Sequence, residues 1–171
     1  MKEVSDIIAP GLAILFIGFN PGERSALTGH HFAGHSNRFW KVLASSGLTP
    51  RQLKPDEDRL LLEYGYGITN IVARPTKAAS EITKEEYRAG RLILLNKIAR
   101  YQPKLACYAG IGVYKELTGT AKIHCGLQTA SVVAGTLDFV VPSPSGLNRT
   151  PFAEQLTYYQ ELRKLTNSPL I

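Results

Sequence analysis

The chain has 171 residues, of which 44% are hydrophobic and 20% are charged, and its formal net charge is +6. These proportions exclude a low-complexity or disordered chain and predict one domain over residues 1–171. The basic balance favours a polyanionic partner without proving one. The opening residues lack a signal-peptide pattern and no apolar stretch could span a bilayer. We therefore expect no membrane partner and a cytoplasmic location, in a prokaryote the cytosol or nucleoid.

The first predicted strand is the apolar run over residues 12–17, which ends at a turn over 18–22. An unbroken apolar run bounded by a turn is typical of a buried parallel strand. A loop rich in Gly and His is expected over 25–35. Ser36 is then expected to cap a helix, because serine hydroxyls accept hydrogen bonds from the first amides of a helix.

The middle of the chain alternates helical and strand patterns, separated by Gly and Pro. The predicted strand over residues 67–72 is expected to end before Arg74-Pro75-Thr76, because proline disfavours its continuation. In chain order we expect a short helix over 56–64, a strand over 67–72, a helix over 83–101, a strand over 105–109 and a helix opened by Gly110 and Gly112.

The last part of the chain predicts two strands and a final helix. Residues 130–134 and 137–141 indicate a hairpin or two neighbouring strands, and Thr150 and Pro151 are expected to begin the last helix. Strands alternating with helices predict an α/β fold, here a three-layer α/β/α sandwich. Its central sheet is expected to be mostly parallel, with helices on both faces.

Metal and redox chemistry are poorly supported by the sequence. The only two cysteines, Cys107 and Cys125, have a spacing that no common metal or redox motif uses, and an iron–sulfur cluster normally needs four. His30, His31 and His35 lack the neighbouring carboxylate or cysteine that zinc sites use. We expect no metal and no cofactor.

Asn20 follows the first strand, at the sheet edge where ligands bind in open α/β sheets. Asn-Pro-Gly is also good turn chemistry, and this reading stays open. An amide has no basic site near neutral pH, but it can accept a hydrogen bond from water and fix its position. That suits a reaction in which a weak nucleophile is placed rather than activated.

Two other loops carry candidate ligand contacts. In the loop over 142–149, Leu147 is either a satellite core contact or an exposed wedge that unstacks a duplex, and Arg149 is a candidate phosphate contact. Phe32 is either a small core anchor or a stacking platform for a flat ligand. Asn70 ends the second predicted strand, at the same sheet edge as Asn20, and it either caps that strand or reads the edge of a base.

Taken together, six stretches of the sequence resemble the mismatch-specific uracil-DNA glycosylase and thymine-DNA glycosylase family. They lie in order from near residue 10 to near residue 165, so the resemblance covers essentially the whole chain, and the first and last are specific when found together. The six stretches are Gly18-Phe19-Asn20-Pro21-Gly22, Thr28-Gly29-His30-His31-Phe32-Ala33-Gly34, Asn37-Arg38-Phe39-Trp40-Lys41, Gly67-Ile68-Thr69-Asn70, Arg74-Pro75-Thr76 and Pro144-Ser145-Gly146-Leu147-Asn148-Arg149.

The resemblance implies a uracil-DNA-glycosylase-like fold and a monofunctional glycosylase without a cofactor. Such an enzyme flips uracil, thymine or a modified cytosine out of a G:U or G:T mismatch and hydrolyses its glycosidic bond, leaving an abasic site. The implied partner is double-stranded DNA that carries the mismatch, and also single-stranded DNA, and the implied state is a monomer.

The resemblance also implies a role for each matching residue. Asn20 would position the attacking water, and Phe32 would stack on the extruded base. Leu147 would fill the vacated stack and, with Gly146, read the widowed guanine. The implied base-binding set is Gly18, Phe19, His31, Phe32 and Asn70, and the implied DNA-contacting set is Ser145, Gly146, Leu147, Asn148 and Arg149.

The chain departs from the family pattern at three positions. Phe19 stands where the family usually has Ile, and we expect it to face the core. Ser143 stands where the family usually has Asn, and Asn148 replaces a small residue.

Two alternatives from other functional classes remain open. One is a lesion-binding module without catalysis, which would use the same loops. The other is a nucleotide-binding α/β enzyme that uses Gly110 and Gly112. Lys115 at the third glycine position and the lack of an acid about 20 residues on weaken that dinucleotide motif.

Overall fold

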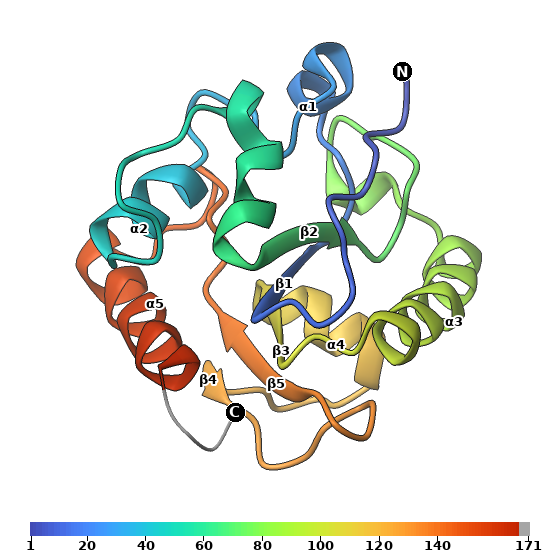
Figure 1. Cartoon of the computed structure of the whole chain (residues 1–171). Coiled ribbons are helices and arrows are strands. Elements are labelled where there is room, and N and C mark those ends of the chain that lie inside the picture. Colours follow the sequence, from blue (N-terminus) through green and yellow to red (C-terminus); the bar gives the residue numbers. More distant parts are fainter. Residues whose placement is uncertain (168–171) are drawn as a thin grey trace.

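The structure, a computed structural model that describes residues 1–167, has a central five-stranded sheet between helices (Figure 1). The strand order is β2-β1-β3-β5-β4; the first four strands run parallel, and β4 is antiparallel to β5. The strands are β1 (Ile14–Gly18), β2 (Tyr66–Asn70), β3 (Leu105–Ala109), β4 (Gly126–Leu127) and β5 (Leu137–Val141).

Helices cover both faces of the sheet, which confirms the predicted three-layer α/β/α sandwich (Figure 1). Helices α2 and α5 pack on one face, and α3 and α4 on the other. The helices are α1 (Glu23–Thr28), α2 (Phe39–Ser45), α3 (Lys84–Tyr101), α4 (Ile111–Thr118) and α5 (Phe152–Thr166), with 3₁₀ helices η1 (Pro55–Tyr64) and η2 (Ala79–Glu81). No helix within residues 1–167 is long and apolar enough to cross a membrane.

The strand β1 lies inside the sheet and is buried on both faces. Ile14 and Phe16 belong to the core cluster under α2 and α5, whereas Leu15 and Ile17 belong to the cluster under α3 and α4. Successive side chains of a strand point to opposite faces, so a strand with two buried faces needs an unbroken apolar run. The parallel strands direct their carboxyl ends to one edge, where the residues that follow β1, β2, β3 and β5 gather.

Several predicted elements differ from the structure. Residues 23–28, expected as loop, form α1. Ser36 does not cap α2; instead the Asn37 Oδ1 accepts the Phe39 N–H at 2.9 Å, and Arg38 is the residue before the helix. Thr150 lies one residue before the N-cap of α5, and Pro151 is that N-cap. The predicted helix over 56–64 is the 3₁₀ helix η1.

The predicted strand over 130–134 is wrong. The antiparallel partner of β5 is the two-residue strand β4. The segment before β5 is instead held by the buried carboxylate of Asp138, which accepts the Val132 N–H at 3.0 Å and the Tyr114 hydroxyl at 2.8 Å. Burial raises the pKa of this Asp138 carboxyl. The Asp138 carboxylate thus takes the place of the strand-to-strand hydrogen bonds that were predicted for residues 130–134.

Candidate active site

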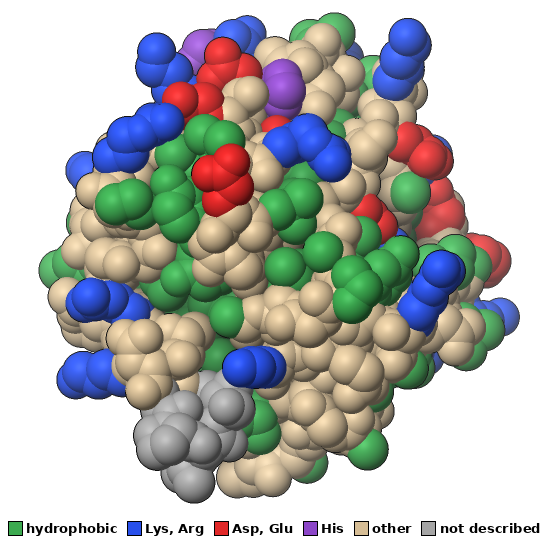
Figure 2. Space-filling view, viewed as in Figure 1, with side chains coloured by type: hydrophobic (Ala, Val, Ile, Leu, Met, Phe, Trp, Pro, Cys, Tyr) green, Lys and Arg blue, Asp and Glu red, His purple; other side chains and the backbone are tan. Residues whose placement is uncertain are grey.

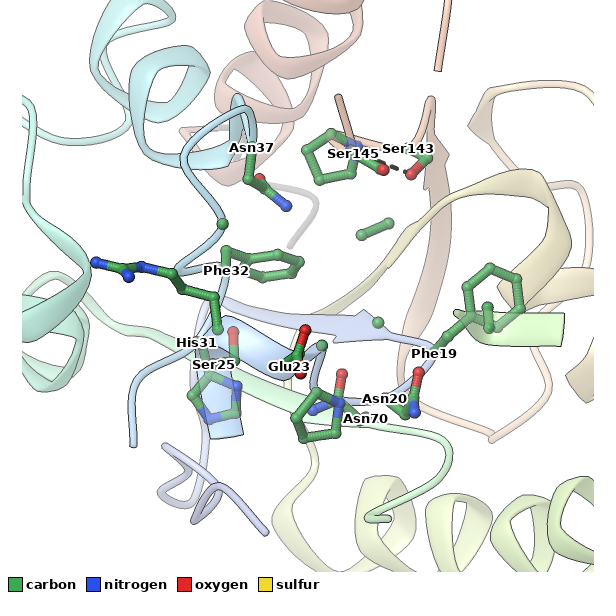
Figure 3. Close-up of a pocket in the computed structure, with 18 residues that line it drawn as sticks. Phe19, Asn20, Glu23, Ser25, His31, Phe32, Asn37, Asn70, Ser143 and Ser145 are labelled. Atoms are coloured by element: carbon green, nitrogen blue, oxygen red, sulfur yellow. Dashed lines mark hydrogen bonds between the residues drawn. The ribbon is translucent and has the colours of Figure 1, made fainter. Parts of the chain in front are cut away.

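A pocket opens at the carboxyl edge of the sheet, where β1 ends (Figure 3). Residues 18–25, part of 31–37 and residues 143–145 form its walls, together with Asn70, Ala79 and Ala109. The turn after β1 and the start of the loop over 142–149 therefore line the same pocket. Its cavity volume of about 280 Å³ is at the small end of ligand pockets and suits a single flat ring.

The turn after β1 is fastened to the segment that follows β2. The carbonyl oxygens of Gly18 and Phe19 accept the N–H groups of Ile71 and Val72, each at 2.9 Å, and Pro21 O accepts Thr76 N–H at 3.2 Å. These bonds continue the strand pairing past the end of the sheet. They hold the backbone around Asn20 fixed, and a group on a fixed backbone can be aimed precisely enough for catalysis.

The side chain of Asn20 is oriented by two hydrogen bonds from its nitrogen. Asn20 Nδ2 donates to Arg74 O and to Thr76 Oγ1, each at 2.8 Å. Arg74 O can only accept, and the Thr76 hydroxyl donates its own proton to Ala78 O at 2.8 Å, so both partners require the NH₂ group. The Oδ1 atom of Asn20 therefore faces away from them, toward the pocket (Figure 3).

The Arg74 side chain fixes the segment that holds Asn20. Its guanidinium pairs with the Glu86 carboxylate and donates to Glu81 O at 3.1 Å. The hydrogen bond from Arg74 lowers the pKa of Glu86 to about 2. Arg74 thus uses its side chain to tie its segment to α3 and its carbonyl to hold the Asn20 amide.

Phe32 lines the pocket on the side opposite Asn20 (Figure 3). Its ring stacks on Phe39 with the ring centroids 4.1 Å apart, and Phe39 in turn meets Phe16 of β1 edge-on at 5.1 Å. The backbone of Phe32 has a φ of 50°, in the left-handed region that non-glycine residues rarely adopt. Such strain persists only where surrounding contacts hold it. One face of the ring is covered by Phe39, and the ring remains part of the pocket wall.

His31 is buried beside Phe32. Its backbone N–H donates to Asp58 Oδ2 at 3.0 Å, and its ring Nε2 lies 2.8 Å from Ser5 O. A carbonyl can only accept, so Nε2 carries the proton in the neutral ring and Nδ1 is left as an acceptor. Burial lowers the pKa of His31, although the Ser5 carbonyl and the Asp58 charge act in the opposite direction.

The burial of His31 predicts a loss of stability in mild acid. Because its folded pKa lies below the unfolded value of 6.5, the unfolded chain binds the proton first. The free energy of unfolding should therefore fall as the pH drops through 6.5 toward the folded pKa. The loss is about 1.4 kcal/mol for each pH unit that separates the folded pKa from the unfolded one. Urea unfolding of the parent and of His31→Gln across this range measures the effect. The dependence of the unfolding free energy on pH should become weaker in His31→Gln and persist in His35→Gln, an exposed control. An unchanged dependence in His31→Gln would contradict the assignment.

Asn70 ends β2 directly beside Gly18 of β1. A Cβ atom at Gly18 would lie 2.7 Å from Asn70 Oδ1 and 3.8 Å from Phe32 Cζ. A side chain at position 18 would therefore push the Asn70 amide out of its place in the pocket wall, while it would meet the Phe32 ring at an ordinary contact distance. The prediction that Asn20 and Asn70 share a sheet edge follows from the parallel pairing of β1 with β2, and both line the pocket.

Phe19 was expected to face the core, and it is partly buried against the core cluster under α3 and α4, where it also lines two cavities. A Cβ atom at Gly112 would lie 2.6 Å from Phe19 Cζ, so the ring fills the space that this glycine leaves. The larger aromatic side chain, standing where the family usually has Ile, is therefore accommodated by a glycine of α4. The Tyr87 ring also meets Phe19 edge-on at 6.3 Å.

The loop after β5 was predicted over 142–149 and is called here the 143–150 loop, because β5 ends at Val141 and α5 begins at Phe152. It has one strongly exposed apolar side chain, Leu147, which is 92% exposed. Asn148 is engaged within the loop: its Nδ2 donates to Ser143 O at 2.9 Å, and its Oδ1 accepts from the Thr150 N–H and hydroxyl. Ser145 Oγ accepts the Leu147 N–H at 3.2 Å. Ser145 lines the pocket, while the Gly146, Leu147, Asn148 and Arg149 part of the predicted set lies outside its lining.

The sequence model of the uracil DNA glycosylase superfamily matches residues 5–165. The chain belongs to this superfamily. A solution NMR structure of a candidate uracil DNA glycosylase from Methanosarcina acetivorans is similar in fold, with a TM-score of 0.62 at 17% sequence identity. The similarity covers 95% of this chain and 98% of that protein. Superfamily members are DNA glycosylases, which are hydrolases, so the chain has a uracil-DNA-glycosylase-like function and acts on DNA.

This uracil DNA glycosylase superfamily member also holds pocket residues that sequence reasoning missed. Glu23 and Asn37 line the pocket, and Ser25 Oγ accepts the Ala33 N–H at 3.1 Å. Thr76, quoted only as part of a motif, is a direct partner of Asn20. The sequence offered little indication of that contact, because 56 residues separate the two.

Charged side chains of both signs lie on one face of this superfamily member. On the face shown in Figure 2, Lys and Arg side chains are spread over the surface, with Asp and Glu side chains among them. Within residues 1–167, no group of three or more His, Cys, Asp or Glu side chains is placed to hold a metal ion.

Proposed function

We propose that this chain is a mismatch-directed DNA glycosylase that removes uracil, and with it thymine or modified cytosine, opposite guanine by hydrolysis. The observation that carries the proposal is the oriented amide of Asn20. It sits in a pocket for one flat ring, opposite Phe32 and beside the loop that bears Leu147. Predicted roles of His31, Asn70 and Arg149 belong to the same proposal.

In this proposal the duplex is opened before any base is read. Leu147 enters the base stack, and the target nucleotide turns into the pocket against Phe32. Extrusion costs a few kcal/mol and least at a mismatch, so a wobble pair is favoured from the start. The Leu147 side chain is 92% exposed in the free protein and is therefore available for insertion into a base stack.

The chemistry then needs little from the protein beyond positioning. The bond between the sugar carbon and the base nitrogen breaks, and its electron pair leaves with the pyrimidine, so the sugar becomes oxocarbenium-like. Asn20 Oδ1 accepts a hydrogen bond from water and holds that water near the sugar carbon. The water oxygen then forms a bond to this carbon. The water proton passes to solvent or to the departing base. A placed water is sufficient because its target is already cationic. Backbone N–H groups near 18–22 are the candidate donors to the pyrimidine anion.

The nucleotide-binding alternative is disfavoured by the packing around Phe19. This ring fills the space against Gly112, at the glycines that a dinucleotide motif would use to approach a pyrophosphate. The lesion-binding alternative uses the same loops as the glycosylase and is separated from it only by experiment.

A panel of end-labelled oligonucleotides tests the proposed function. The purified protein is incubated with G:U, G:T, A:U and G:C duplexes and with a uracil-bearing single strand, then treated with alkali to cleave abasic sites. We expect cleavage of G:U fastest, of G:T more slowly, and none of G:C. Tight mismatch binding without alkali-labile product on any uracil substrate would identify a lesion-binding module instead.

A further inference from the structure

The side chain of Arg38 is turned into the loop over 143–150. Its Nη1 donates to Thr150 O at 3.2 Å, and its Nη2 donates to Ser145 O at 3.1 Å and to Asn148 O at 2.6 Å. Its backbone N–H adds a fourth bond, to Pro144 O at 2.9 Å. One residue, more than 100 positions away along the chain, thus holds the loop at four carbonyl groups.

The guanidinium is oriented by three of these carbonyls, those of Ser145, Asn148 and Thr150. Its Nε is buried and has no hydrogen-bond partner among residues 1–167. None of the ion pairs found within that range involves Arg38. A planar fork can donate to several carbonyls at fixed angles, whereas the single ammonium of lysine cannot reproduce that geometry. The site is therefore specific for arginine, and its function is to fix the loop rather than to balance a charge.

A second contact brings the same two stretches together. A Cβ atom at Gly146, next to Leu147, would lie 2.3 Å from Ser36 Oγ. The backbone that carries Leu147 therefore packs directly on residue 36, two positions before Arg38. On the other side, Asn37 accepts the N–H of Phe39, whose ring stacks on Phe32.

We propose that Arg38 is a positioning residue that holds the 143–150 loop ready for insertion into the duplex and links it to the Phe32 ring of the pocket. It contacts neither base nor sugar and acts through Leu147. The inference rests on the proposed function, because it assumes that this loop enters the base stack.

The physical effect of Arg38 is preorganisation. A loop with a Gly at 146 and an exposed Leu147 loses conformational freedom when it enters a duplex, and that loss weakens binding. When four bonds fix the loop beforehand, less freedom is lost on insertion. Removing the fork should therefore weaken engagement with duplex DNA and leave the hydrolysis of an already accessible base unchanged.

Single-turnover excision from a G:U duplex and from a uracil-bearing single strand separates these steps. Arg38→Lys is expected to raise the protein concentration for half-maximal rate on the duplex by roughly tenfold. Its maximal rate on the duplex and its excision from the single strand should stay within about threefold of the parent. Arg88→Lys, an exposed position on α3, serves as the matched control and should behave as the parent.

A double variant tests whether Arg38 acts through Leu147. If it does, Arg38→Lys combined with Leu147→Ala should lose little more on the duplex than Leu147→Ala alone, because the coupled effects are not additive. Arg38→Gln, whose single amide cannot donate to the three carbonyls together, should reproduce the duplex-selective loss and serves if Arg38→Lys fails to fold. Equal losses on duplex and single strand, parental duplex behaviour of both variants, or fully additive losses would overturn the inference. A parent that releases no uracil from either substrate would overturn the proposed function itself.

Discussion

Replacing Asn20 with alanine is expected to slow uracil release from a G:U duplex by at least about 100-fold, while mismatch binding changes by less than about threefold. Alanine removes the side-chain oxygen that the bonds to Arg74 and Thr76 orient toward the pocket. In the variant no side chain at position 20 holds the attacking water in place, so the rate of hydrolysis falls while DNA binding is retained. Single-turnover excision and gel-shift titration measure the two quantities separately.

Two further variants make the Asn20 test specific. Asn20→Asp keeps an acceptor oxygen but places a second oxygen against Arg74 O and Thr76 Oγ1, so it should be displaced and lose activity as well. Asn96→Ala, on the exposed face of α3, removes an unrelated amide and should leave the rate unchanged. A parental rate in Asn20→Ala would show that water is placed by another group.

The strands were predictable where burial dictated the sequence. Strands β1, β3 and β5 lie inside the sheet, so their apolar runs carry information about the fold. Helix α1 gave no comparable pattern, since it has six residues between two glycines and its Leu27 is 74% exposed. A short helix without an apolar stripe cannot be told from a loop by periodicity. The strand β4 has only two residues and was missed for the same reason.

The site was predictable to the extent that it depends on strand ends and motifs. Asn20 and Asn70 share an edge because β1 and β2 are parallel neighbours, and the sequence predicted this. The groups that orient Asn20 and the 143–150 loop were not predictable. Thr76 and Arg38 act through contacts that span 56 and more than 100 residues, and no local pattern reports such contacts. Even the motif that contains Arg38 indicated a family and not a role.

The exposed leucine of the 143–150 loop leads to the second large effect: Leu147→Ala should weaken engagement of the G:U duplex about 10- to 150-fold. That range corresponds to the roughly 1.5–3 kcal/mol gained when a leucine side chain moves from water into an apolar environment such as a base stack. Excision from a uracil-bearing single strand, which has no stack to open, should stay close to the parental rate.

Two controls distinguish insertion from a general loss of apolar surface. Leu92→Ala removes a leucine that is 62% exposed on α3, outside the pocket lining, and should leave duplex excision unchanged. Leu147→Met keeps a long apolar side chain and should retain most of the duplex activity. Because Leu147 is 92% exposed, its truncation should leave the melting temperature nearly unchanged, so a selective loss on duplex DNA reports recognition rather than folding. Equal losses on duplex and single strand would mean that Leu147 does not enter the stack.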